Sequence, residues 1–183
     1  MAEAEQEARR AANRYRTFWR RVGAGFVDGL VLLPVTFLFE PTYSIWMSGP
    51  APVFRELLSD AIPAAYTVIL HARCGQTLGK MVTGVTVLDV SESRLPTLLQ
   101  AALRDIGEIV IDLIAVFFVG YLAVTAGYVP GAEYNSPAWL VIGYSALAWF
   151  IIEVATMLTN GKRRALHDFI AGTVVVRVPR RLR

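Results

Sequence analysis

The chain has 183 residues, of which 55% are hydrophobic and 18% are charged, and its formal net charge is +3. Soluble domains average about 45–50% apolar and about 25% charged residues, so this composition indicates a membrane protein rather than a soluble domain. The positive charge does not indicate nucleic-acid binding, because no aromatic and basic residues interleave on a polar surface. The single cysteine, Cys74, excludes an intrachain disulfide and a cysteine-rich metal site.

The chain begins with a basic segment, residues 1–17, and we expect the first 22 residues to form a helix on the membrane surface. Tyr15, Phe18 and Trp19 lie among arginines there, which is typical of an interfacial amphipathic element. The first apolar stretch follows at about 23–40 and contains Asp28. It is longer than the apolar region of a signal peptide, so we predict a span that is retained.

Three later stretches, at about 52–72, 105–129 and 137–159, are also long enough to cross a membrane. The first half of the 52–72 stretch carries Arg55, Glu56 and Asp60, so a re-entrant segment is the alternative to a span there. Residues 81–90 and 173–178 are rich in β-branched residues and too short to span a membrane. We predict that they pair as a small two-stranded ladder.

The basic residues determine the predicted topology. Of the 18 Lys and Arg residues, six lie in residues 9–21, four in 73–104 and seven from 162 to the end, while 22–54 and 105–161 have none. Cytoplasmic loops are enriched in Lys and Arg, so both termini and the 73–104 segment are expected inside. That arrangement requires an even number of crossings, and the loops at 40–52 and 130–137 then face outward. The last residues, 179–183, form a basic tail.

Carboxylates lie inside the apolar stretches, at Asp28, Glu108, Asp112 and Glu153. An ionised side chain at mid-bilayer costs roughly 2.5–3.5 kcal/mol on insertion scales, so a chain that keeps several pairs them or uses them. A helical rise of about 1.5 Å per residue places Asp28, Asp112 and Glu153 at similar depth below the cytoplasmic surface. We predict an acidic layer open to the cytoplasm that could hold protons or a small cation.

The alternative is that these acids only fix the packing, as buried ion pairs with Arg21, Arg73 and Arg104. Arg104 and Glu108 are one helical turn apart and could pair. Catalytic chemistry has little support, because the sequence shows no nucleophile with a plausible base and orienting group. The glycine-rich segment 75–80 is not a phosphate-binding loop, since its glycine spacing differs and Met81 replaces the Ser or Thr that would bind magnesium.

Several motifs together resemble the RDD family of small bacterial membrane proteins. They are Arg20-Arg21-Val22-Gly23 through Asp28, Gly75-Gln76-Thr77-Leu78-Gly79-Lys80 with Gly84-Val85-Thr86-Val87, Leu103-Arg104-Asp105, and Leu166-His167-Asp168 with the 171–176 segment. They occur in the family's order and cover about residues 18–178. The resemblance implies that Arg21 is the family arginine, Asp28 its first aspartate and Asp168 its second. Lys80 and Arg104 match recurrent basic positions, whereas Glu108 and Asp112 lie outside the pattern.

We therefore predict an all-α membrane protein: a four-transmembrane-helix bundle with an N-terminal interfacial helix and a small cytoplasmic two-stranded β element. The resemblance implies the bacterial inner membrane, and transport is the activity suspected for the family, with sodium-for-proton exchange attributed to a few members. The expected function is a cation- or proton-coupled transporter component. The alternative is a non-catalytic accessory subunit of a larger membrane complex. We expect no cofactor or metal, and as partners the lipid bilayer and a homo-oligomer or other membrane subunits.

Residue roles follow from this expectation. The predicted ion- or proton-binding residues are Asp28, Glu108, Asp112 and Glu153. The predicted charge-pairing and motif residues are Arg21, Gly75, Gly79, Lys80, Arg104, Asp105 and Asp168. Arg21 and Asp168 should both lie near the inner surface, so a contact between them is expected.

Overall fold

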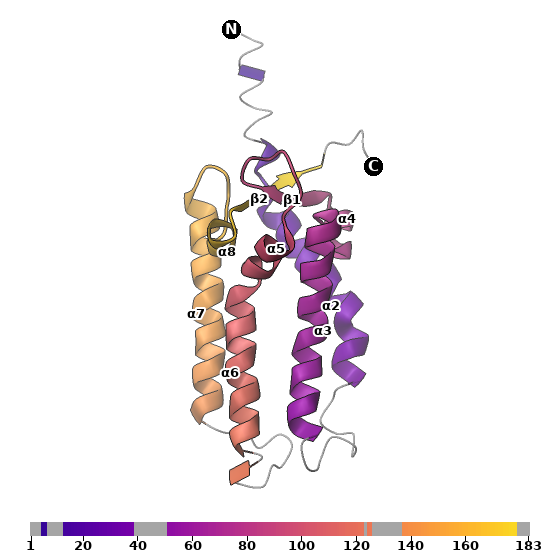
Figure 1. The fold of residues 1–183 in the computed structure, drawn as a ribbon. Coiled ribbons are helices and arrows are strands. Elements are labelled where there is room, and N and C mark those ends of the chain that lie inside the picture. Colours follow the sequence, from indigo (N-terminus) through magenta and orange to yellow (C-terminus); the bar gives the residue numbers. More distant parts are fainter. Residues whose placement is uncertain (1–4, 7–12, 39–50, 123, 126–136, 179–183) are drawn as a thin grey trace.

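The computed structural model describes residues 5–6, 13–38, 51–122, 124–125 and 137–178, and within them the chain is mostly helical. Long helices lie side by side (Figure 1): α2 (Phe18–Leu38), α3 (Ala51–Cys74), α6 (Ile106–Leu122) and α7 (Pro137–Thr159). Short elements gather at one end of these helices: α4 (Leu78–Thr83), β1 (Val85–Asp89), α5 (Leu98–Arg104), α8 (Leu166–Ile170) and β2 (Thr173–Arg177). We call these short elements the cap.

Within the described residues, two helices are long and apolar enough to cross a membrane. They are α2 and the Trp139–Thr159 part of α7, and they correspond to the first and last predicted spans. Helix α3 has 24 residues but carries Arg55, Glu56 and Asp60 in its first half, and α6 has 17 residues. The second and third spans therefore stay predictions, as does the four-span bundle.

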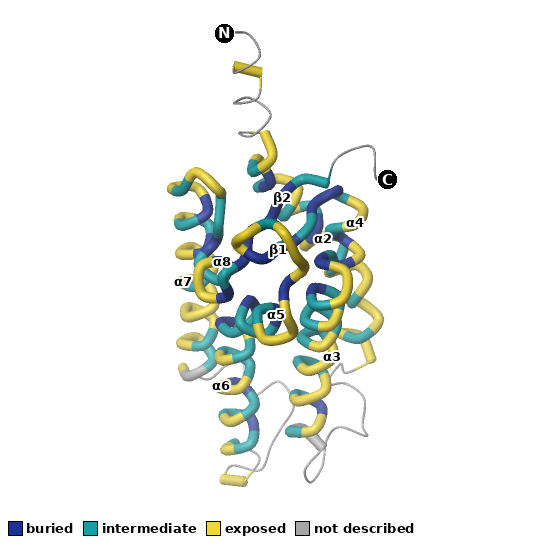
Figure 2. The backbone as a smooth tube through the Cα atoms, turned by 45° about the horizontal axis from the view of Figure 1, so that its top comes forward, coloured by how far each residue is buried: buried dark blue, intermediate teal, exposed yellow. Residues whose placement is uncertain are grey.

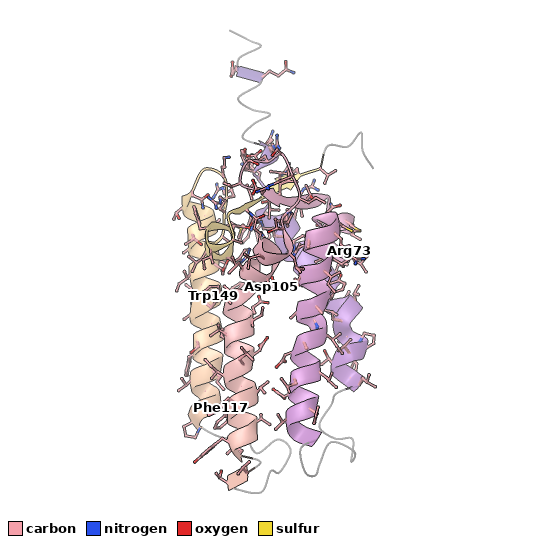
Figure 3. The ribbon with its side chains drawn as sticks, in the orientation of Figure 1. Arg73, Asp105, Phe117 and Trp149 are labelled. Atoms are coloured by element: carbon pink, nitrogen blue, oxygen red, sulfur yellow. The ribbon has the colours of Figure 1, made fainter. Side chains whose placement is uncertain are left out.

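The long helices direct large apolar side chains outward. Phe117 on α6 is 78% exposed and Phe26 on α2 is 70% exposed, and Figure 3 shows such side chains along the length of all four helices. A soluble monomer seldom exposes apolar surface this extensively, whereas lipid-facing helices must. Inside the bundle, α6 and α7 approach closely at Gly107, where an added Cβ would lie 2.1 Å from a ring carbon of Trp149.

The buried core is concentrated in the cap, as Figure 2 shows around β1 and β2. Strands β1 and β2 pair antiparallel with Val87 opposite Val175, and Val85, Val87 and Val175 form a fully buried cluster. β-Branched residues pack well on a pleated surface, which explains why these two short segments form strands. The predicted two-stranded ladder is confirmed, although Met81–Thr83 of the predicted first segment belongs to α4.

Two boundaries differ from the sequence predictions. Residues 18–22 were expected in a surface helix, but they form the beginning of α2, and residues 1–4 and 7–12 lie outside the described part. The helix expected to run through Arg104 is interrupted: α5 ends at Arg104, and Asp105 adopts φ −95° and ψ 7° before α6 begins. The predicted outer loops at 40–52 and 130–137 lie almost wholly outside the described residues.

Candidate functional site

Asp168 is the centre of a buried charge cluster where the cap meets the long helices. Its side chain is completely buried. One carboxylate oxygen accepts a hydrogen bond from Arg21 at 2.8 Å, and the other accepts bonds from Arg104 and from the Thr173 hydroxyl at 3.1 Å. The backbone N–H of Ala165 donates to the oxygen that Arg21 contacts, at 3.1 Å. The contact expected between Arg21 and Asp168 is therefore present.

The charge of Asp168 is stabilised by these partners. Burial alone would raise its pKa, but the nearby Arg104 and Arg21 guanidinium groups hold the pKa of Asp168 well below its ordinary value. The sequence allowed Arg104 to pair with Glu108, one helical turn away. Instead, the break at Asp105 turns Arg104 into the cap, where its guanidinium bonds to Asp168, Thr173 and His167.

His167 connects this cluster to α7. Its Nε2 lies 3.2 Å from an Arg104 nitrogen, and its Nδ1 lies 2.8 Å from Oε2 of Glu153. A guanidinium only donates, so Nε2 is the acceptor in the contact with Arg104. The backbone N–H of His167 also donates to Glu153 at 3.0 Å. Glu153 thus contacts a histidine, and not one of the arginines that the alternative interpretation offered as its partners.

Asp28 holds the beginning of α4. Its carboxylate accepts hydrogen bonds from the Tyr66 hydroxyl at 2.7 Å, the Thr77 hydroxyl at 2.6 Å and the backbone N–H of Gly79 at 2.8 Å. Thr77 is itself the N-cap of α4 and accepts a bond from the N–H of Lys80. Three neutral donors therefore satisfy the half-buried carboxylate and tie α2 and α3 to the cap.

Gly75 and Gly79 are each required at their position, for different steric reasons. A Cβ on Gly79 would lie 2.1 Å from the backbone oxygen of Ala24, so only glycine lets α4 approach α2 this closely. Gly75 has φ +67°, a left-handed conformation, and a Cβ there would lie 2.7 Å from the backbone oxygen of Val87. Both glycines of this segment thus position the cap.

Lys80 follows Gly79 and lies next to His71, with 2.8 Å between its Nζ and the histidine Nε2. Burial and the positive charge of Arg104 lower the pKa of Lys80 to about 8. Asp105 accepts a hydrogen bond from Thr67 on α3, which joins the α5–α6 junction to that helix. Figure 3 labels Asp105 at this junction.

A cavity of about 610 Å³ lies directly beneath the cap, between α2, α6 and α7. All four carboxylates predicted for ion or proton binding line it, together with three of the predicted basic residues: Asp28, Glu108, Asp112, Glu153, Arg21, Lys80 and Arg104. Asp168, Asp105 and the two glycines do not line it. Within the described part of the chain, Glu108 and Asp112 form no hydrogen bond or ion pair, unlike Asp28 and Glu153.

A second cavity, of about 300 Å³, lies between α3 and α6, and Asp112 lines this one as well. The other acid in it is Asp60 of α3, whose Oδ2 is buried without a hydrogen-bond partner. Sequence reasoning did not include Asp60 among the site residues. In the structure, Thr67 of α3 bonds to Asp105, and Asp60 and Asp112 each lie about two turns from that contact toward the opposite end of the helices, at the same level. That pairing of α3 with α6 is not visible in the sequence.

Carboxylates within membrane helices can take up and release protons, and four of them line this cavity. No set of three or more His, Cys, Asp or Glu side chains in the described residues is placed to hold a metal ion.

Comparison with known proteins gives a family. The model of the RDD family matches residues 15–172. A search of curated proteins and a search of solved structures each found no match. The matched range includes the Arg21, Arg104 and Asp168 cluster, the Asp28 cap of α4 and both cavities. It covers most of the chain, and with two apolar helices of spanning length it fits a membrane protein. This chain belongs to the RDD family.

Proposed function

We propose that the protein is a component of a cation- or proton-coupled transporter. In this proposal the four long helices span the bacterial inner membrane, with the cap and both termini in the cytoplasm. One observation carries the proposal: four carboxylates from three different long helices converge on one cavity beneath the cap. Acids within membrane helices are costly, and by default they indicate an ion or proton pathway.

The roles of these acids differ. Asp28 holds the beginning of α4 and Glu153 pairs with His167, so we assign primary ion or proton exchange to Asp112 and Glu108, with Glu153 in support. Asp112 has the central role because it lines both cavities. Asp60 continues the route across to α3, and Glu56 lies one turn farther along that helix. Asp60 and Glu56 thus place acidic groups on α3, beyond the cavity beneath the cap.

The alternative proposal is a non-catalytic accessory subunit that assembles or stabilises a larger membrane complex. The exposed apolar faces of the helices favour it, because another membrane subunit could pack there. Four spans are few for a complete alternating-access path, which usually needs two repeats. A transporter role therefore implies a homo-oligomer or a partner subunit. The route through Asp112 to Asp60 favours transport, since an accessory role needs no acids between α3 and α6.

The test is cation-driven proton flux in proteoliposomes, measured with an internal pH dye under sodium or potassium gradients. We expect flux with the wild type and its loss with Asp112→Asn, while tryptophan fluorescence shows the variant to be folded. Glu92→Gln is the matched control, because Glu92 lies on the cap surface, where it pairs with Arg14 and Lys162. Flux absent in the wild type under both gradients would favour the accessory subunit. Flux equal in wild type and Asp112→Asn would remove the acidic cavity from the mechanism.

A further inference from the structure

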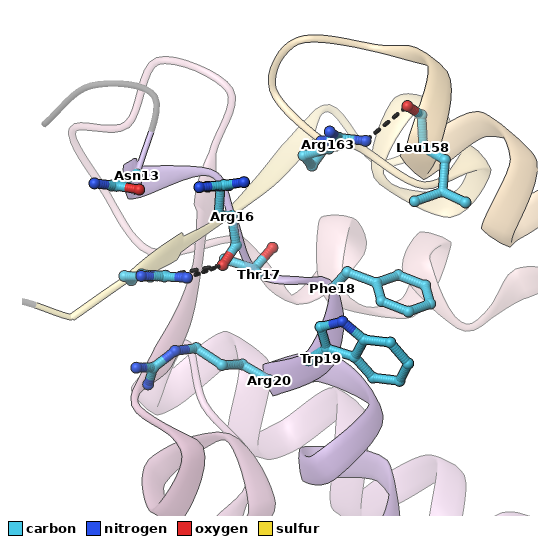
Figure 4. A pocket seen from close by; sticks show the side chains of 9 residues that line it. Asn13, Arg16, Thr17, Phe18, Trp19, Arg20, Leu158 and Arg163 are labelled. Carbon is cyan, nitrogen blue, oxygen red and sulfur yellow. Dashed lines mark hydrogen bonds between the residues drawn. The ribbon is translucent and has the colours of Figure 1, made fainter. Parts of the chain in front are cut away.

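Another pocket, separate from the cavity beneath the cap and from the one between α3 and α6, lies where α2 begins and α7 ends. Its volume is about 550 Å³, and four arginines line it: Arg16, Arg20, Arg163 and Arg177. The remaining lining residues are Asn13, Thr17, Phe18, Trp19 and Leu158. Figure 4 shows the labelled arginines around the hollow, with Phe18 and Trp19 beside them. Among the described residues, no carboxylate lines this pocket.

The positive charge of the pocket is uncompensated by the described residues. None of its four arginines forms an ion pair there, in contrast to Arg14, Arg21 and Arg104, which each contact a carboxylate. The pKa of Arg177 is lowered by burial and by the positive charges of Arg20 and Arg16. Like charges repel one another at such short range, so an arrangement of this kind favours a bound anion.

The arginines are also held in place by backbone carbonyl groups. Arg177 donates two hydrogen bonds to the carbonyl oxygen of Arg16, at 2.8 and 2.6 Å. Arg163 donates to the carbonyl oxygen of Leu158 at 2.7 Å, and Arg20 donates to that of Thr83. Each guanidinium has five N–H groups, so donors remain for a ligand. Positioned guanidinium groups bind phosphate oxygens with little further loss of side-chain entropy.

The position of the pocket indicates the source of the anion. It lies at the cap ends of α2 and α7, the two helices that are long and apolar enough to span a membrane. Trp19 beside it is 79% exposed, and tryptophan is enriched at the level of the lipid headgroups. Anionic lipids of the cytoplasmic leaflet present phosphates at this level.

We propose that this pocket binds the phosphate headgroup of an anionic phospholipid such as phosphatidylglycerol. Arg16, Arg20 and Arg163 contact the phosphate oxygens, and Trp19 packs beside the start of the acyl chains. The proposal requires α2 and α7 to lie in the membrane, but it does not depend on transport. Absence of flux in the wild type would therefore leave it unaffected.

The test uses purified, delipidated protein in a non-ionic detergent, titrated in a calorimeter with short-chain phosphatidylglycerol, short-chain phosphatidylcholine and inorganic phosphate. Arg16→Gln is the main variant, because it keeps the hydrogen bonds that Arg16 forms across the pocket. Within the described residues, those bonds go to the backbone oxygen of Arg16, which the substitution does not change. Arg20→Gln is the second variant. Arg73→Gln is the matched control: Arg73 is exposed at the cap end of α3 and does not line the pocket (Figure 3).

We expect phosphatidylglycerol to bind more tightly than phosphatidylcholine. Arg16→Gln should weaken phosphatidylglycerol binding about tenfold, as loss of one charge-assisted hydrogen bond predicts, and Arg73→Gln should leave it unchanged. Equal affinity for the two lipids would overturn the proposal. So would an equal loss in Arg16→Gln and Arg73→Gln, since net charge alone would then explain binding. Phosphate that binds as tightly as phosphatidylglycerol would make this a site for free phosphate and overturn the lipid assignment.

Discussion

Replacement of Asp168 by asparagine tests whether the buried charge cluster stabilises the fold. The substitution keeps the side-chain volume and removes the negative charge that faces Arg21 and Arg104. Those two side chains are only 12% and 4% exposed, so water cannot replace the lost carboxylate. Removing one partner of a buried ion pair costs about 3–5 kcal/mol, because it leaves buried charge uncompensated. Each kcal/mol lowers Tm by about 2–4 °C for a chain of this size. We therefore expect Asp168→Asn to lower Tm by about 6–20 °C.

The assay is thermal unfolding in detergent, followed by intrinsic tryptophan fluorescence. Thiol-reactive dyes are unsuitable, because Cys74 is already exposed in the folded protein. Glu92→Gln again serves as control: the Glu92 side chain is 14% exposed, and it pairs with Arg14 and Lys162, which are 46% and 47% exposed. Water can therefore solvate these two cations when the carboxylate is lost, and pairs with such exposed partners contribute about 1 kcal/mol or less. If Asp168→Asn and Glu92→Gln lower Tm by the same amount, the reasoning about buried charge is refuted.

Two further outcomes are expected. The folded pKa of Asp168 is depressed, so its contribution to stability is fully present above its unfolded pKa of about 3.9 and is lost as pH falls below that value. The difference in Tm between wild type and Asp168→Asn should therefore narrow below about pH 4. A constant difference down to pH 3 would contradict this. Gly79→Ala should lower Tm strongly, because the added Cβ would lie 2.1 Å from the backbone oxygen of Ala24. Gly25→Ala is the control: a Cβ there meets nothing within 4 Å, so Tm should be unchanged or raised. Equal effects of the two substitutions on Tm would contradict the close approach of α4 and α2.

Local patterns predicted the elements of this fold well. Runs of β-branched residues identified both strands, and the apolar stretches correspond to the four long helices. The positions of the acids relative to the helix ends also placed Asp28, Asp112 and Glu153 at one level, and the structure brings all three to one cavity. These inferences succeeded because helical rise and side-chain periodicity depend only on nearby residues.

Partner choice could not be predicted in the same way. Arg104 has Glu108 one turn away, yet it bonds to Asp168 because α5 and α6 are separate helices. No Pro lies at the break, and Gly107, two residues after it, is already part of α6. The capping box of Thr97 and Gln100, which begins α5, does not show where that helix ends. Pairs such as His167 with Glu153 depend on how distant segments pack, and a single sequence does not encode that packing in any local pattern.

The position of Asp168 in the chain has a consequence for biogenesis. Arg21 and Arg104 are synthesised long before their shared carboxylate, so both stay uncompensated while the earlier helices enter the membrane. In the topology proposed above, they add during that period to the positive charge that retains their segments on the cytoplasmic side. Only when α8 emerges can Asp168 bond to Arg21 and Arg104. In that topology the same arginines first direct insertion and then, once paired with Asp168, stabilise the completed protein.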